Sequence, residues 1–268
     1  MDLRSRLKLI VVRLDRKFFG GFLTNFRNLK SSSRDFLYLS KRTQTHSLHI
    51  NYNSRVNSLA YLCHKFGTDK GEIKEILGDH RLLRGVHNYS DFYDLLLSHR
   101  RLDIKRVFEC GIGTNNDLLE SSMGKHGIPG ASLRVWQEYF PEAIVIGADI
   151  DSDTLFEDSR ISTFFVDQTK PESIRAMWEK VGNEKFDLMI DDGLHTFSAG
   201  ITLFENSFHL LKDFGVYVIE DVNPWDVASF EEYFQNLEFQ VYFVHLLRRG
   251  KSLGDNSLVL IKKVLDLG

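Results

Sequence analysis

The segment that decides the fold is Val107-Phe108-Glu109-Cys110-Gly111-Ile112-Gly113-Thr114. It reads as a buried strand that ends in a turn with two glycines. Because glycine has no Cβ, the backbone at Gly111 and Gly113 can pass close to a bound ligand. Ligands of open α/β sheets bind at the carboxyl ends of the strands, so this turn is the first candidate binding element. Asn116 stands where a GxGxxG dinucleotide motif needs its third glycine, which weakens an NAD interpretation.

Strand-like and helix-like segments alternate on the carboxyl side of this turn, which predicts a parallel sheet covered on both faces. The chain then ends differently, because the last two strands have no helix between them, only the turn-rich segment 248–256. The predicted strands are 106–110, 143–148, 162–166, 186–190, 216–219, 238–245 and 257–262, and the predicted helices are 132–139, 171–181, 197–212 and 226–237. The expectation is therefore a mostly parallel seven-stranded sheet with an antiparallel C-terminal hairpin.

Acidic residues stand at the ends of three successive predicted strands. Glu109 precedes the glycines, Asp149 ends the second strand, and Asp167-Gln168 follow the third. A carboxylate at position 149 can accept hydrogen bonds from both hydroxyls of a ribose. Gln168 and Asp167 are placed to hydrogen-bond an adenine edge, and Glu109 to lie near the amino-acid portion of an S-adenosylmethionine cofactor. Together the three strand ends predict a nucleoside-containing cofactor.

Composition sets the class of protein. With 268 residues, 43% hydrophobic and 26% charged, the chain is long enough for one α/β domain and an appendage. Its two cysteines, Cys63 and Cys110, fit neither a CxxC metal spacing nor a disulfide framework, which favours a cytoplasmic setting. The formal net charge of -3 gives no reason to expect nucleic acid as the substrate.

The first 45 residues differ from the rest, since they hold eleven Lys or Arg and only three acids. Leu3, Leu7, Ile10, Leu14 and Phe18 recur at helical spacing and predict a basic amphipathic helix. Three interpretations stay open: a helix docked on the body or on a second subunit, a peripheral anchor on an anionic membrane through residues 1–30, or an organellar targeting peptide. The polar run 40–54 predicts a linker, so the expected division is a basic extension over 1–55 and one domain over 56–268.

An ordered series of motifs makes the sequence recognisable. The chain resembles class I S-adenosylmethionine-dependent methyltransferases of the macrolide-sugar O-methyltransferase type, which includes the mycinamicin and macrocin enzymes. The likeness covers roughly residues 60–222. The segments that carry it are 66–71 (FGTDKG), 87–89 (HNY) with Tyr93, 109–113 (ECGIG), 130–136 (GASLRVW), 146–150 (IGADI), 190–195 (IDDGLH) and 219–221 (IED).

The resemblance implies a Rossmann-like α/β fold and a set of site residues. It adds Thr68, Tyr93, Ser132 and Asp191 to the expected cofactor contacts. It implies Asp192, Glu220 and Asp221 as ligands of Mg²⁺. It also implies a sugar hydroxyl as the acceptor, in a natural product or in polysaccharide biosynthesis, and a homo-oligomer.

The residues themselves argue for a metal and a base. Asp191-Asp192 and Glu220-Asp221 follow the fourth and fifth strands, so four carboxylates meet at one rim and would repel unless a cation lay among them. Oxygen ligands favour a hard cation such as Mg²⁺. His195, three residues after Asp192, is the candidate general base, because imidazole titrates near neutral pH. The alternatives are helix capping by the aspartates and a structural histidine.

The predicted function is therefore an S-adenosylmethionine-dependent, Mg²⁺-assisted O-methyltransferase that acts on a sugar hydroxyl. Two other classes remain as alternatives. One is a non-catalytic cofactor-binding subunit of a larger assembly, which would have no need of the cluster at Asp192, His195, Glu220 and Asp221. The other is an NAD-dependent oxidoreductase, which the missing third glycine and the terminal hairpin disfavour.

Overall fold

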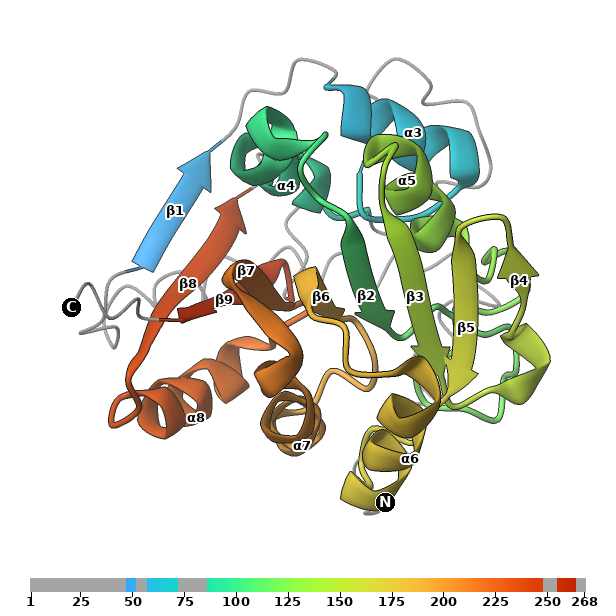
Figure 1. Cartoon of the computed structure of the whole chain (residues 1–268). Coiled ribbons are helices and arrows are strands. Elements are labelled where there is room, and N and C mark those ends of the chain that lie inside the picture. Colours follow the sequence, from blue (N-terminus) through green and yellow to red (C-terminus); the bar gives the residue numbers. More distant parts are fainter. Residues whose placement is uncertain (1–46, 52–56, 72–85, 248–254, 264–268) are drawn as a thin grey trace, which may run out of the picture.

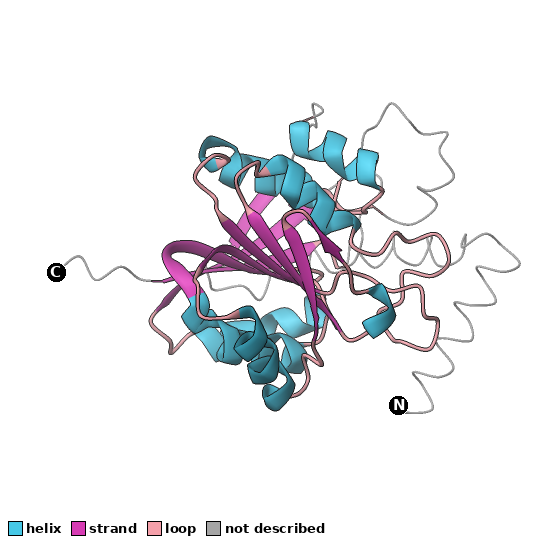
Figure 2. Cartoon of the chain, turned by 45° about the vertical axis from the view of Figure 1, so that its right-hand side comes forward, coloured by secondary structure: helices cyan, strands magenta, loops and turns pink. Residues whose placement is uncertain are grey.

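A computed structural model describes residues 47–51, 57–71, 86–247 and 255–263 of the chain. Residues 1–46, which include the predicted basic amphipathic helix, lie outside the described residues. The described part forms a single sheet with helices on both sides (Figures 1 and 2). No helix of the described residues is long and apolar enough to cross a membrane.

The sheet has nine strands in the order β1-β8-β9-β7-β6-β2-β3-β5-β4. The bounds are β1 Ser47–Asn51, β2 Arg106–Cys110, β3 Ile144–Asp149, β4 Glu157–Asp158, β5 Ile161–Phe165, β6 Phe186–Asp191, β7 Leu211–Ile219, β8 Phe239–Leu247 and β9 Ser257–Lys263. Strands β5, β3, β2, β6 and β7 run parallel to one another, and β9 is antiparallel to both β7 and β8. The predicted parallel sheet with its antiparallel hairpin is confirmed, and the seven predicted strands are its central ones.

Two short edge strands extend this predicted sheet. β4 pairs antiparallel with β5, and β1 pairs parallel with β8. The prediction of a linker over 40–54 is therefore wrong for Ser47–Asn51. The sequence there, SLHIN, alternates polar and apolar residues with the period of two that an edge strand uses, but five residues are a short pattern inside a polar run.

Helices cover the two faces in separate layers (Figure 2). On one side α3 (Ser58–Phe66) packs against α4 (Tyr89–Leu97) and α5 (Ala131–Tyr139). On the other side α6 (Pro171–Val181), α7 (Phe197–Ser207) and α8 (Pro224–Phe234) lie in a row. Short 3₁₀ turns occupy 98–100, 152–154 and 208–210. α7 was predicted to reach residue 212, but Leu211 and Lys212 already belong to β7.

Successive residues of a central strand pack alternately into two hydrophobic cores, one on each face of the sheet. In β2, Val107 packs on the α3–α5 side, while Phe108 packs on the α6–α8 side against Trp178. In β7, Val218 and Tyr217 divide in the same way. Because both faces of the sheet are buried, a shift in register would move apolar side chains from one core to the other, so the register of the central strands is fixed. Their carboxyl ends therefore come to the same edge of the sheet, where the candidate site lies.

Candidate functional site

The turn after β2 is shaped by its two glycines. Gly111 and Gly113 have φ angles of 87° and 89°, in the region that glycine adopts without strain. A Cβ on Gly111 would lie 2.0 Å from the backbone oxygen of Asp192, and one on Gly113 would lie 2.2 Å from Cε of Met123. Side chains are thus excluded at both positions, and the turn presents bare backbone, as the sequence predicts.

Asp149, at the end of β3, is tied to this turn. Its Oδ2 accepts hydrogen bonds from the backbone N–H groups of Ile112 at 2.9 Å and Gly113 at 3.1 Å, and its Oδ1 accepts one from Asp151 N at 2.9 Å. Burial raises the pKa of Asp149, and these backbone donors oppose that shift. The carboxylate that was predicted from sequence to contact a ribose therefore lies directly beside the glycine turn.

An open cavity of about 640 Å³ lies over the turn. This volume is in the size range of small-molecule and cofactor sites. Its walls come from the segment after α3, the loop 120–128, the start of α5 and the ends of β3, β6 and β7. The predicted cofactor residues that line it are Thr68, Gly111, Gly113, Ser132 and Asp149. The loop between β2 and α5 supplies one wall through residues 120–128.

Two other predicted cofactor residues form a supporting layer behind the wall. Gln168 donates from Nε2 to Oδ1 of Asp191 at 2.9 Å and accepts at Oε1 from Leu194 N at 2.8 Å. Asp191 also accepts from Gly193 N at 3.2 Å. Burial raises the pKa of Asp191 to about 6. Gln168 and Asp191 thereby fix the turn after β6, which carries Asp192 and His195.

Asp167 lies apart from the cavity lining. Its carboxylate accepts from Thr169 Oγ1 at 2.6 Å and pairs with Lys170 at 2.8 Å. These contacts hold the loop between β5 and α6. A role for Asp167 in adenine recognition stays a prediction.

A lysine that the sequence did not single out lies at the base of the cavity. Nζ of Lys70 is 2.6 Å from Oδ2 of Asp192 and 3.2 Å from Oε1 of Glu109, and it donates a hydrogen bond to Oε2 of Glu220. Lys70 is buried, as are Glu109 and Glu220. This lysine therefore supplies positive charge to carboxylates from the ends of three adjacent strands, β2, β6 and β7.

Glu109 and Glu220 are held on their other sides by aromatic donors. Trp136 Nε1 donates to Oε2 of Glu109 at 2.7 Å, and the Tyr93 hydroxyl donates to Oε1 of Glu220 at 2.5 Å. Glu109 and Tyr93, predicted as cofactor contacts, thus lie beneath the cavity floor, with no exposed surface. Both Glu220 oxygens are engaged within the protein, by Tyr93 and by Lys70.

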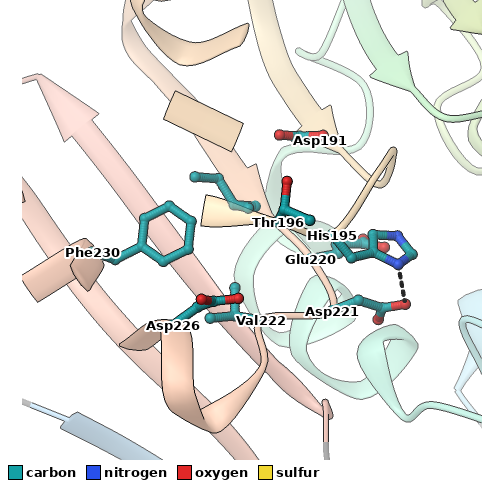
Figure 3. Close-up of a pocket in the computed structure, with 9 residues that line it drawn as sticks. Asp191, His195, Thr196, Glu220, Asp221, Val222, Asp226 and Phe230 are labelled. Carbon is teal, nitrogen blue, oxygen red and sulfur yellow. Dashed lines mark ion pairs between the residues drawn. The ribbon is translucent and has the colours of Figure 1, made fainter. Parts of the chain in front are cut away.

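The rim of the cavity carries His195 between two aspartates. His195 Nε2 is 3.2 Å from Oδ1 of Asp192, and its Nδ1 is 3.7 Å from Oδ2 of Asp221. Figure 3 shows His195 beside Asp221, with Glu220 behind them and Thr196 above. A small pocket opens on this side towards Asp226 and Phe230 of α8.

The backbone at this rim is strained. Among the described residues, His195 (φ 57°) and Asp221 (φ 52°) are the two non-glycine residues in the left-handed region. Each such residue costs of the order of 1–3 kcal/mol and persists only where its surroundings impose it. The fold is therefore less stable than it would be without this strain, and the strained backbone places the two side chains side by side at the rim.

Asp221 is oriented by two further side chains whose roles the sequence left open. The Tyr89 hydroxyl donates to Oδ1 of Asp221 at 2.5 Å, and His87 Nε2 lies 3.4 Å from the same oxygen. His87 and Tyr89 stack at 4.5 Å between ring centroids, and His87 Nδ1 lies 3.1 Å from Oδ1 of Asn256. The only signal for them in the sequence is the HNY motif of the resemblance.

The charges at the rim favour a cation. Burial works to lower the pKa of His195, but its hydrogen bond to Asp192 and the charge of Asp221 outweigh it and raise the pKa to about 10. Ligand atoms of Asp192, His195 and Asp221 all lie within 4.8 Å of one another. The carboxylate oxygens of Asp192 and Asp221 are the kind of ligand that Mg²⁺ and Mn²⁺ prefer. The residues at the rim therefore fit a divalent ion, and those around the glycine turn fit a nucleoside cofactor.

Comparison with known proteins identifies related sequences over half of the chain. No family model matches it. An L-olivosyl-oleandolide 3-O-methyltransferase of Streptomyces antibioticus is 40% identical over 138 residues, 51% of this chain and 33% of the relative. An 8-demethyl-8-alpha-L-rhamnosyl tetracenomycin-C 2'-O-methyltransferase of Streptomyces olivaceus is 32% identical over 138 residues, 52% of this chain and 34% of the relative. The match thus spans about a third of these relatives' length.

Among solved structures, the chain is similar to the MycE methyltransferase from the mycinamycin biosynthetic pathway in complex with Mg, SAH and mycinamycin VI. That likeness has a TM-score of 0.55 and 24% identity, and it covers 80% of this chain and 57% of the other. The chain has a methyltransferase fold. The expected resemblance to macrolide-sugar O-methyltransferases is confirmed by these relatives. In this fold, the cavity and the rim lie at the carboxyl ends of the parallel strands.

Proposed function

We propose that the chain is an S-adenosylmethionine-dependent O-methyltransferase that uses Mg²⁺ and methylates a hydroxyl group on a sugar-bearing acceptor. The observation that carries this proposal is a single cavity with two chemically different ends. One end has the bare glycine turn and Asp149, and the other has the rim of Asp192, His195 and Asp221. A nucleoside cofactor and an ion-bound hydroxyl could meet in that space.

The cofactor would be held mainly by the turn after β2. Gly111 and Gly113 have no side chains, so the cofactor could approach the backbone of the turn closely. Asp149 would accept hydrogen bonds from the ribose hydroxyls of the cofactor. Thr68 and Ser132 line the same cavity and supply hydroxyl groups. Gln168 and Asp191 would act indirectly, because they fix the turn after β6, which borders the cavity.

The metal would be held by Asp192 and Asp221. Glu220, the third ligand that the family resemblance implies, has its oxygens engaged by Lys70 and Tyr93 and would have to share one of them with the ion. When bound, Mg²⁺ lowers the pKa of a coordinated hydroxyl and S-adenosylmethionine supplies an electrophilic methyl group. Tyr89 and His87 would keep Asp221 aimed at the ion. In-line alignment of the reacting groups is then a matter of positioning by the cavity walls.

His195 would take the proton from the acceptor hydroxyl. Its Nε2 is held by Asp192 at 3.2 Å, while Nδ1 is 3.7 Å from Asp221, beyond hydrogen-bond length, and is the atom able to accept a proton. The carboxylates that raise its pKa would be neutralised by a divalent ion, which returns the imidazole towards its neutral form. Asp192 would then orient the ring, as a carboxylate beside a catalytic histidine commonly does.

The acceptor class comes from the relatives, whose names specify sugar hydroxyls on rhamnosyl and olivosyl groups. We extend the proposal to a glycosylated metabolite or a cytoplasmic step of polysaccharide biosynthesis. The eleven basic residues among the first 45 support a peripheral contact with an anionic membrane, where lipid-linked glycans lie, or with a second subunit.

The test is transfer of a labelled methyl group from S-adenosylmethionine to rhamnosylated and olivosylated acceptors, with Mg²⁺ and with excess EDTA. The proposal expects Mg²⁺-dependent transfer that falls at least a hundredfold in His195→Ala. His209→Ala is the matched control, because His209 lies in the 3₁₀ turn before β7. Cofactor binding without transfer to any acceptor would favour the non-catalytic alternative.

A further inference from the structure

A single ammonium group joins the ends of three strands beneath the proposed metal site. Lys70 has 3% of its surface exposed, and its Nζ contacts Glu109 on β2, Glu220 just after β7 and Asp192 just after β6. Burying a lysine costs free energy unless it is paired. Here the compensation comes from carboxylates that would otherwise be buried close together without a counter-charge.

Of these carboxylates, Asp192 reaches the cavity rim with one oxygen, while both oxygens of Glu220 are held by partners inside the protein. Asp192 turns Oδ2 to Lys70 and Oδ1 to His195. Glu220 turns Oε2 to Lys70 and Oε1 to Tyr93. Lys70 therefore occupies the inner side of the cluster, and the outer side is left facing His195 and Asp221 at the cavity rim.

We propose that Lys70 is a positioning residue: a fixed internal cation that neutralises the inner side of the carboxylate cluster and restricts divalent-ion binding to one ion at the outer side. This inference rests on the proposed metal site and deepens it. Without Lys70 the three carboxylates would lose the one counter-charge that they share. A divalent ion would then be bound more tightly and would take over part of the neutralisation.

The position of Lys70 in the chain suits this role. It follows α3 directly after the C-cap Gly67, and the residues around it are held by backbone bonds from His87 N to Asp69 O and from Ser90 N to Lys70 O, both 2.8 Å. These bonds attach the lysine segment to the start of α4, which also supplies Tyr93. The charge is thus built into the scaffold and does not depend on a mobile surface side chain.

The experiment titrates Mn²⁺ alone into the full chain, free of other metals, and follows bound ion by electron paramagnetic resonance and unfolding by temperature. In Lys70→Met we expect a lower Tm without metal, a Mn²⁺ Kd at least tenfold tighter than wild type, and a larger Mn²⁺-dependent rise in Tm. Lys65→Met is the matched control, because Lys65 pairs with Glu138 on the surface and both are about half exposed. It should leave the Mn²⁺ Kd unchanged.

A role in packing alone predicts a lower Tm in Lys70→Met with an unchanged Kd and an unchanged Mn²⁺-dependent rise, and that result would overturn the inference. If wild type itself binds no Mn²⁺, the metal part of the proposed function fails, which is a separate outcome. Should Lys70→Met not fold, two further variants give the answer. Glu109→Gln removes one negative charge and should weaken Mn²⁺ binding, and Lys70→Met/Glu109→Gln removes one charge of each sign and should return the Kd towards the wild-type value.

Discussion

At the scale of single residues, the backbone of Asp221 is a place where stability is given up for geometry. With a φ of 52°, it adopts a conformation that glycine tolerates and alanine does not. We expect Asp221→Gly to be more stable than Asp221→Ala by about 1 kcal/mol, since both lose the carboxylate and only alanine keeps the strain. Urea unfolding measures the difference. Equal stabilities would contradict the claim that the backbone is strained there.

The glycine turn offers a second test at this scale. Gly111→Ala would bring a Cβ to 2.0 Å from the Asp192 backbone oxygen, and neither backbone can move aside cheaply. We expect a loss of several kcal/mol in unfolding free energy and of cofactor binding. Gly182→Ala is the control, because Gly182 has a φ of 91° and nothing within 4 Å of its Cβ position. It should show only the backbone penalty, of about 1–3 kcal/mol. Similar losses in both variants would count against a steric role for Gly111.

How much of the site the sequence predicts differs from residue to residue. Asp149, the glycines and the trio of Asp192, His195 and Asp221 could be found, because strand ends of a parallel sheet converge and acids at those ends are visible in the sequence. The role of Lys70 could not, although Lys70 belongs to the FGTDKG segment, since Asp192 and Glu220 lie 122 and 150 residues further along the chain. Glu109 and Tyr93 lie beneath the cavity floor, which the sequence does not indicate, and their contact with the cofactor stays a prediction.

At the scale of elements, the N-cap of α3 joins this helix to α4. Its N-cap Asn57 accepts from Ala60 N at 2.6 Å and donates from Nδ2 to Oδ1 of Asp91 on α4 at 3.0 Å. Asn57→Ala should cost about 1–2 kcal/mol, and Asn57→Ser should cost less because the cap acceptor is kept. Urea unfolding of the two variants decides. The same loss in both would mean that the cap does not stabilise α3.

Element bounds were predicted well where burial imposes a clear period. β2 and α6 have the predicted bounds, and the other central strands begin within one residue of the predicted start, except β7, which begins at Leu211 although its start was predicted at residue 216. α7 was extended too far because Phe208, Leu210 and Leu211 continue an apolar pattern after the helix ends. β1 was missed because a short edge strand pairs through its backbone, which a five-residue sequence pattern specifies weakly.

At the scale of the whole molecule, a ligand in the cavity links the segment after α3 to the ends of the sheet, so binding should stabilise the entire domain. S-adenosylhomocysteine at a hundredfold excess over its Kd adds about 2.7 kcal/mol, a Tm rise of roughly 5–10 °C for a domain of this size. Asp149→Asn should abolish most of the rise, because that carboxylate borders the cavity. Asp213→Asn is the control and should keep the rise, since Asp213 is exposed on β7 and pairs with Lys263. An equal loss in both variants would contradict a specific role for Asp149.

The measurement that tests the central claim most directly is calorimetric titration of metal-free protein, first with S-adenosylhomocysteine and then with Mg²⁺, for wild type and Asp192→Ala. The account predicts that both proteins bind the cofactor product and that only wild type gives a further Mg²⁺ heat, with one ion per chain. Cofactor binding with no Mg²⁺ heat in wild type would contradict the metal-assisted mechanism, and absence of cofactor binding would contradict the proposed function as a whole.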